Sequence, residues 1–100
     1  MTVSSLRYKT EINSLKLNLD DFKPVQFKYN EVLLDHHHDD DRIHYGFIAE
    51  ELERANPDLV IYNEEGQPDA VDYQSIIALC VKEIQELKKE IHELKEKMKQ

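Results

Sequence analysis

A serine and a lysine lie five positions apart near the start of the chain, as Ser4 and Lys9. A lysine amine without its extra proton can accept the proton of a serine hydroxyl, and the resulting alkoxide can attack a carbonyl carbon. A lysine in water keeps its proton at neutral pH, so this chemistry needs desolvation or a second cation close by. Arg7 is the nearest cation in the sequence. The pair therefore predicts nucleophilic catalysis only where the fold supplies such surroundings, since so short a motif often occurs by chance.

Regular secondary structure limits how these two side chains can meet. Residues five apart point about 140° away from each other on a helix, and they lie on opposite faces of a strand. We therefore expect Ser4 and Lys9 to meet only across a bend or between two chains. In either case, assembly could act as a switch if it removes the lysine from water.

A run of three histidines and three aspartates is the second candidate for chemistry, because imidazoles and carboxylates both bind metals. Consecutive residues of a loop cannot all point at one ion, and their spacing matches none of the separated ligand pairs of structural zinc sites. We therefore interpret the run as part of a protruding loop over residues 30–45, and we predict no metal site and no cofactor. The run consists of His36, His37, His38, Asp39, Asp40 and Asp41.

The last quarter of the chain repeats every seven residues, with apolar side chains at positions a and d and no Gly or Pro. Glu83 at position g would face Lys88 at position e of a parallel neighbour, and Glu90 would face Lys95 in the same way. The pattern predicts a self-associating parallel coiled coil. Its core residues are Ile77, Cys80, Ile84, Leu87, Ile91, Leu94 and Met98.

The heptads leave two questions open. Isoleucine at a with leucine at d nominally favours two strands, so this segment does not choose between a dimer and a trimer. A single helix packed on its own domain is the alternative, although such a helix usually shows a wider apolar face. We expect Cys80, the only cysteine, to be a buried core residue rather than a reactive thiol.

Length and charge restrict the possible partners. The 100 residues suffice for one small domain, so we divide the chain into a body over residues 1–75 and a stalk over residues 76–100. A net charge of −8 lacks the basic surface that nucleic acids and anionic membranes require. We find no signal-peptide pattern and no apolar stretch long enough to span a bilayer. We therefore expect a soluble protein without a nucleic-acid or membrane partner.

The body begins with an ambiguous apolar pattern. The residues that recur at helical spacing are Ile12, Leu15, Leu19 and Phe22. We therefore predict a helix over residues 11–22, although Leu17 between Leu15 and Leu19 also fits the alternation of a strand.

The rest of the body predicts an α+β fold of short strands and helices. After Pro24 the period changes to two, and Val25, Phe27 and Tyr29 form the expected core face of a half-buried strand. The other expected elements are a helix over residues 47–55 ended by Asn56-Pro57, a strand over residues 59–62, a turn over residues 63–66, and a returning strand over residues 70–73 before the terminal helix.

Six segments occur along the chain in a recognisable order: residues 4–12 (SSLRYKTEI), 24–29 (PVQFKY), 46–52 (GFIAEEL), 56–60 (NPDLV), 71–73 (VDY) and the heptads. Their order resembles the self-cleaving intramolecular chaperone domain of endosialidase-type phage tailspikes. The resemblance covers nearly the whole chain, and the Gly-Phe-Ile-Ala segment and the Ser-to-Lys spacing are its most specific parts. Within that family, the chain is most similar to the C-terminal domain of neck appendage proteins from tailed phages of Bacillus.

The resemblance implies a domain that forms a trimer at the end of a longer fibre or spike, with a trimeric coiled coil as its stalk. It implies that the domain assists folding of an upstream triple-stranded β-helix of the same precursor and then cuts itself off. The expected place is the host bacterial cytoplasm during phage assembly, with the precursor destined for the virion tail or neck appendage.

The resemblance also implies roles for single residues. Ser4 would be the catalytic serine, Lys9 its general base, and the scissile bond would join Ser4 to Ser5. Arg7 and Glu50 are candidate accessory residues. The family often has Asp after the serine, whereas this chain has Ser5, which leaves open which hydroxyl lies nearer the reacting carbonyl.

The sequence does not decide which carbonyl reacts. Attack by Ser4 on its own carbonyl would close a strained four-membered ring. Attack on the preceding carbonyl closes a five-membered ring, but the cut would then fall between Val3 and Ser4. Two other functions remain open: a passive coiled-coil trimerisation module without cleavage, and a metal-binding domain that relies on the histidine run.

Overall fold

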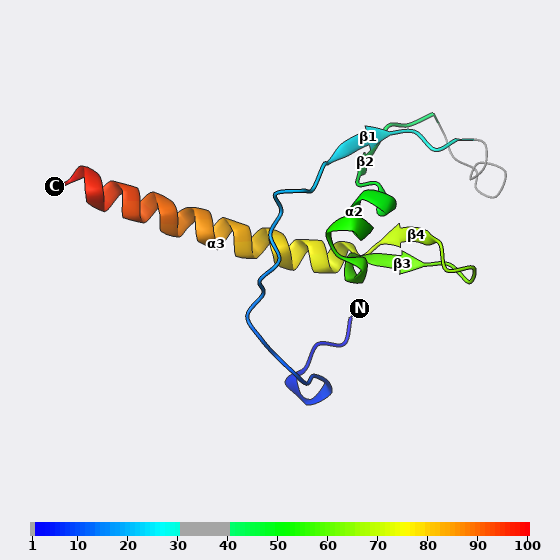
Figure 1. Cartoon of the computed structure of the whole chain (residues 1–100), viewed down its shortest axis with the longest axis horizontal. Coiled ribbons are helices and arrows are strands. Elements are labelled where there is room, and N and C mark those ends of the chain that lie inside the picture. Colours follow the sequence, from blue (N-terminus) through cyan, green and yellow to red (C-terminus); the bar gives the residue numbers. More distant parts are fainter. Residues whose placement is uncertain (1, 31–40) are drawn as a thin grey trace.

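The computed structural model describes residues 2–30 and 41–100, which form two antiparallel strand pairs, one short helix and one long helix (Figure 1). The strands β1 and β2 pair through Val25↔Gly46 and Phe27↔His44, and β3 and β4 pair through Val60↔Val71. The elements are η1 (Leu6–Tyr8), β1 (Val25–Phe27), β2 (His44–Gly46), α2 (Ala49–Ala55), η2 (Pro57–Leu59), β3 (Val60–Tyr62), β4 (Pro68–Val71) and α3 (Tyr73–Met98). The predicted small α+β body with a long terminal helix is confirmed.

The core of the body is small. Leu52 of α2, Val60 of β3 and Ile76 of α3 form one buried cluster. Leu79, one turn further along α3, has no exposed surface at all. Because the first turns of α3 belong to this core, the helix is fixed to the body before it runs out as a stalk. The partly buried residues that pack around the cluster are Phe22, Phe47, Ala49 and Val71.

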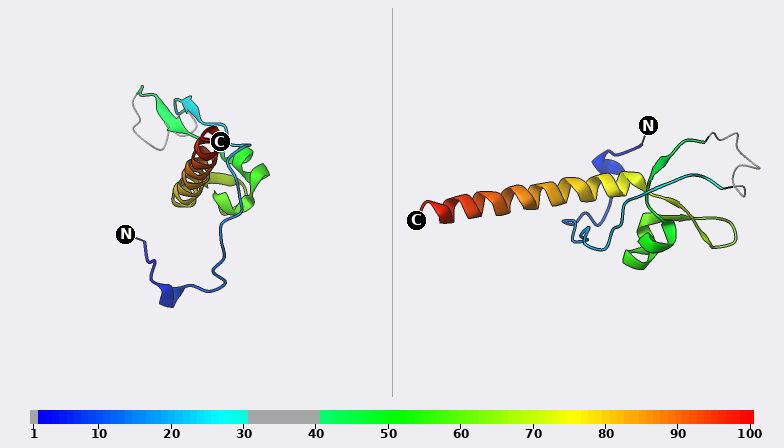
Figure 2. Two further views of the ribbon diagram at one scale, coloured as in Figure 1. Left: turned by 90° about the vertical axis from the view of Figure 1, so that its left-hand side faces the viewer. Right: turned by 90° about the horizontal axis from the view of Figure 1, so that it is seen from above.

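The stalk makes the molecule long. Its extents are 62 × 37 × 26 Å, and its radius of gyration is 18.1 Å, against about 13 Å for a compact domain of this length. Figure 2 shows α3 projecting from the body along most of its length. Neither of the helices in the described part of the chain has the length and apolar character that crossing a membrane requires.

The turn between β3 and β4 follows the prediction for residues 63–66. The Asn63 side-chain oxygen accepts hydrogen bonds from the backbone N–H groups of Glu65 and Gln67, both at 2.9 Å. Gly66 has a φ of 81°, a left-handed conformation that favours glycine. The local turn chemistry therefore sets this hairpin.

The strand after Pro24 is shorter than predicted. Val25 and Phe27 are half-buried on one face of β1, as the alternation indicates, but the strand ends before Tyr29. The Tyr29 ring instead packs beside β1, with its centroid 5.2 Å from that of Phe27 and 4.7 Å from that of His44. His44 lies in β2, so the predicted loop over residues 30–45 ends in a strand.

The predicted helix over residues 11–22 is wrong. The segment is extended, and Leu17 and Leu19 alternate with exposed neighbours, as in the strand pattern. Two side chains of α3 bind its backbone: Lys82 Nζ donates to the Leu17 carbonyl at 2.7 Å, and the Leu19 N–H donates to Glu83 Oε1 at 2.9 Å. These contacts satisfy backbone groups that a helix would otherwise satisfy internally.

The returning strand also differs from its prediction over residues 70–73. It begins two residues earlier, as β4 (Pro68–Val71), and Tyr73 is already the first residue of α3. The reason is the N-cap of the helix at Asp72, whose carboxylate accepts from the Ser75 N–H at 3.2 Å and from the Ser75 hydroxyl at 2.8 Å.

The cap predicts a pH dependence of stability. The hydroxyl of Ser75, and then its backbone N–H, lower the pKa of Asp72 below its ordinary value of 3.8. A carboxyl whose pKa is lower in the folded state stabilises the fold above its unfolded pKa, and this stabilisation is lost as the pH falls through the folded pKa. Asp72→Asn keeps a capping oxygen that does not titrate, so its stability should fall less than that of the wild type below about pH 4.

The measurement is thermal unfolding followed by circular dichroism across this pH range. Asp72→Ala, which removes the cap, should lose about 0.5–2 kcal/mol at neutral pH, whereas Asp72→Asn should lose little. Equal pH profiles for the wild type and Asp72→Asn would show that this carboxyl does not contribute.

Candidate active site

Residues 2–19 form an extended arm that leaves the body, turns at η1 and returns to α3 (Figures 1 and 2). At its start, Gln74 Nε2 of α3 donates to Thr2 Oγ1 at 2.6 Å. At its end, the arm is held by Lys82 and Glu83 of the same helix. Both ends of the arm are therefore fixed on one helix, and the middle extends into solvent.

The arm brings Ser4 and Lys9 together. The short helix η1 reverses the chain between them, and Lys9 Nζ donates a hydrogen bond to Ser4 Oγ at 2.7 Å. The contact lies across a bend within one chain, which is one of the two arrangements that the spacing allows. The distance is within the range in which a base can take a proton from a hydroxyl.

Ser5 has a different role in this turn. It is the N-cap of η1, and its Oγ accepts from the backbone N–H of Arg7 at 3.5 Å and from the Arg7 guanidinium at 3.2 Å. The guanidinium also donates to the Tyr8 hydroxyl at 2.7 Å and lies 4.4 Å from the centre of that ring. Of the two serine hydroxyls, the structure places that of Ser4 against the lysine and that of Ser5 against the arginine.

The pair is accessible to water in the single chain. Ser4 and Lys9 are both exposed, and so are their apolar neighbours on the arm. Val3 and Leu6 keep 74% and 73% of their surface exposed. Such a surface costs free energy in water, so the arm has an apolar face that nothing within its own chain covers.

Glu50 lies away from this pair, on the first turn of α2. Among the described residues, no hydrogen bond or ion pair joins it to Arg7 or Lys9. With Phe27, Tyr29 and Ala49, it lines a separate hollow. Arg7 contacts Ser5 rather than Lys9.

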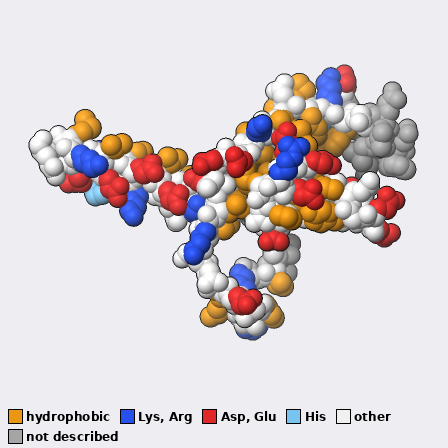
Figure 3. All heavy atoms as spheres, viewed as in Figure 1, with side chains coloured by type: hydrophobic (Ala, Val, Ile, Leu, Met, Phe, Trp, Pro, Cys, Tyr) orange, Lys and Arg blue, Asp and Glu red, His pale blue; other side chains and the backbone are white. Residues whose placement is uncertain are grey.

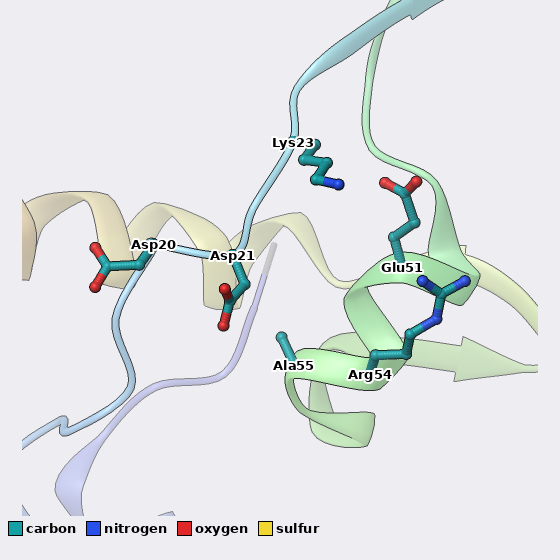
Figure 4. A pocket seen from close by; sticks show the side chains of 6 residues that line it. All are labelled: Asp20, Asp21, Lys23, Glu51, Arg54 and Ala55. Atoms are coloured by element: carbon teal, nitrogen blue, oxygen red, sulfur yellow. The ribbon is translucent and has the colours of Figure 1, made fainter.

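A charged hollow of about 300 Å³ lies between the Asp20–Lys23 segment and α2 (Figure 4). Asp20 and Asp21 come from the end of the extended segment, and Glu51 and Arg54 come from the helix. Neither Ser4 nor Lys9 lines it. This hollow is therefore separate from the candidate catalytic pair.

Most of the histidine run lies outside the described residues, which include only its last member, Asp41. That residue is exposed and pairs with Lys28 at 3.1 Å. Within residues 2–30 and 41–100, no group of three or more potential ligands is placed to hold a metal ion.

The apolar residues at positions a and d form an exposed surface along α3, which we call the stripe. Ile84 keeps 56% of its surface exposed, whereas Ile76 and Leu79 on the neighbouring face are buried in the body. Cys80 is likewise exposed in the single chain. Hydrophobic side chains follow one edge of the stalk in Figure 3. The large side chains of the stripe are Ile77, Ile84, Leu87, Ile91, Leu94 and Met98.

Glu83, one member of a predicted ion pair between neighbouring stalks, already makes a contact within its own chain. Glu83 is half-buried, and its Oε1 accepts from the Leu19 N–H. That carboxylate therefore binds the end of the arm, a role that the heptad position alone did not indicate. The predicted partners Glu90 and Lys95 lie further out on the exposed stalk.

Comparison with known proteins gives one assignment. No curated protein sequence matches this chain. A family model described as chaperone of endosialidase matches residues 4–61, which is more than half of the chain and includes both Ser4 and Lys9. The chain therefore belongs to the chaperone of endosialidase family.

Proposed function

We propose that this protein is an intramolecular chaperone that forms a trimer, assists folding of an upstream β-helix of the same precursor, and releases itself by a single autoproteolytic cut between Ser4 and Ser5. Ser4 is the nucleophile and Lys9 is the general base. The observation that carries the proposal is the 2.7 Å hydrogen bond between Lys9 Nζ and Ser4 Oγ in a chain of this family. The family match also begins at Ser4.

The chemistry requires a neutral lysine. The lone pair of Lys9 Nζ takes the proton of the Ser4 hydroxyl, and the serine oxygen bonds to a backbone carbonyl carbon. The C–N bond then breaks, the proton passes to the leaving nitrogen, and an ester and a new amino terminus form. Water hydrolyses the ester and restores the serine. No cofactor takes part in this scheme.

Ring size indicates which chain supplies the nucleophile. Within one chain, Ser4 Oγ reaches its own carbonyl only through a four-membered ring. A cut between Ser4 and Ser5 by the Ser4 hydroxyl therefore implies attack from a neighbouring copy. Attack within one chain would favour the Val3 carbonyl and would leave Ser4 as the first residue of the released domain.

Assembly would also supply the missing desolvation. In the single chain, the Lys9 side chain is exposed to water. If a neighbouring copy covers the apolar face of the arm, burial favours the neutral amine, because it penalises the charged form. Cleavage would then follow assembly and would report that it is complete.

The stripe supports the chaperone part of the proposal. An exposed apolar stripe with parallel charge matching can align copies in register at one end of a precursor. A triple-stranded β-helix needs three chains in register, which favours a trimer over the dimer that the heptads also permit. By resemblance, the precursor would be a neck appendage or tailspike made in the host cytoplasm and destined for the virion.

The experiment is intact-mass analysis of this domain expressed with its native upstream segment. We expect a C-terminal fragment that begins at Ser5, released from a protein that sedimentation shows to be trimeric. A fragment beginning at Ser4 would move the attack to the Val3 carbonyl. An uncut precursor that still forms trimers would leave only the passive trimerisation module.

A further inference from the structure

The stripe continues from the stalk into the body. Tyr73, the first residue of α3, lies one heptad before Cys80 and therefore occupies a d position. Its side chain is about half exposed, and its ring packs against that of Phe47 with centroids 6.3 Å apart. The surface that faces a neighbouring stalk thus includes an aromatic residue of the body.

A hollow of about 550 Å³ opens beside Tyr73, against β1 and β2. None of its lining residues is charged, in a chain of which 34% of the residues are charged. Tyr45 of β2 is 75% exposed at this hollow. Uncharged surfaces rich in tyrosine and phenylalanine are typical of the centres of protein interfaces. The other lining residues are Pro24, Val25, Gln26, Gly46 and Phe47.

Gly46 allows the Tyr73 ring to pack closely at this surface. A methyl group at this position would collide with the Tyr73 hydroxyl and would lie 3.6 Å from the Phe27 ring. The absence of a side chain therefore lets the tyrosine lie directly against the β2 backbone. A surface that is already ordered before binding loses less conformational entropy when a partner docks.

The β1–β2 pair, which lines the hollow, lies on the same side of α3 as the hydrophobic edge of the stalk (Figures 1 and 3). The β1–β2 pair stands over the first turns of α3 in Figure 1, and the hydrophobic edge of the stalk faces the same direction in Figure 3. Parallel copies that pack along the stripe must occupy that side.

We propose that the hollow between Tyr45 and Tyr73 is an interface with a second copy of this chain, so that contact between copies reaches from the stalk to the β1–β2 pair. The inference rests on the stalk association proposed above. The second copy is the expected occupant because the uncharged surface is continuous with the stripe through a d position. In a ring of copies, the hollow of one copy receives a different surface of the next.

The test uses tryptophan fluorescence, because the chain contains no tryptophan. In the full chain with Tyr45→Trp, assembly should shift the emission to shorter wavelength and lower the quenching constant of acrylamide several-fold. Adding Ile84→Glu, which should separate the stalks, is expected to reverse both changes. Tyr62→Trp on β3, which does not line this hollow, is the matched control and should respond little to assembly.

The outcomes separate this inference from the proposed function. Tyr45→Trp that stays accessible in a protein shown by sedimentation to be associated would overturn the docking surface and leave the stalk association intact. If the tryptophan at position 45 stays protected from acrylamide in separated chains, or is protected only when the upstream segment is present, something other than a second copy fills the hollow. Either result would also overturn the inferred docking surface. A protein that is monomeric at all concentrations would overturn both proposals.

Discussion

Replacing Ser4 with alanine in the precursor is expected to abolish release of this domain, because no other hydroxyl contacts the Lys9 amine among the hydrogen bonds of the described residues. Lys9→Ala should slow release by about 10²–10⁴-fold, the usual contribution of a general base. Lys9→Arg should be similarly slow, since a guanidinium does not give up its proton in proteins. The measurement is the rate of appearance of the released fragment by mass spectrometry.

The arm offers matched controls for these variants. Ser14 and Lys16 are exposed on the same extended segment, so Ser14→Ala and Lys16→Ala make the same chemical changes away from the pair. Both should cleave at the wild-type rate. Release that persists in Ser4→Ala and Lys9→Ala would remove the pair from the mechanism.

A Ser5→Ala variant distinguishes the two hydroxyls. Ser5 caps η1 and binds Arg7, so its loss should weaken the turn and slow cleavage without abolishing it. Complete loss of cleavage in Ser5→Ala, with normal cleavage in Ser4→Ala, would instead assign the nucleophile to Ser5, whose attack on the Ser4 carbonyl closes a five-membered ring.

Ile84→Glu is expected to prevent association of the stalks. Ile84 occupies an a position and is exposed in the single chain, so the substitution should leave the body folded. In the assembly, each copy would bury a carboxylate beside its neighbours, at a cost of several kcal/mol per ion. Because 1.36 kcal/mol is a factor of about ten, association should weaken by at least about 10³-fold.

The adjacent residue supplies the control for the stalk. Gln85→Glu adds the same charge at position b, which faces away from the coiled-coil seam. Sedimentation should show separated chains for Ile84→Glu and wild-type assembly for Gln85→Glu. If assembly switches on cleavage, the Ile84→Glu precursor should also remain uncut, whereas cleavage at the normal rate in separated chains would refute the switch.

Local patterns predicted the parts of the fold that local chemistry determines. The long helix follows from uninterrupted heptads, and the β3–β4 hairpin follows from Asn63 and Gly66 at a turn. The segment over residues 11–22 was ambiguous because its leucines fit both periods. What decides it is the contact with Lys82 and Glu83, residues distant in the sequence, which periodicity does not report.

The candidate site, too, could be predicted only in part from local sequence patterns. The sequence contains the serine, the lysine and the nearby arginine, but the meeting of Ser4 and Lys9 depends on η1, a turn too short to show any period. A signal for that turn existed in Ser5, a good N-cap residue. Glu50 was a candidate neighbour of Lys9 or Arg7, and only the fold places it on α2, beside a different hollow.

The two attachments of the arm would make the proposed cut at Ser4 hard to reverse. Before the cut, Thr2 and the Leu17–Leu19 segment are both held on α3, so the chain between them is a closed loop. After the proposed cut, Thr2 would stay with the upstream product, and the new terminus would be a tail attached to α3 at one end only. Bringing the two ends together again would cost the entropy of closing that loop. In the proposed scheme, the greater conformational freedom of the released tail would therefore disfavour rejoining of the two ends.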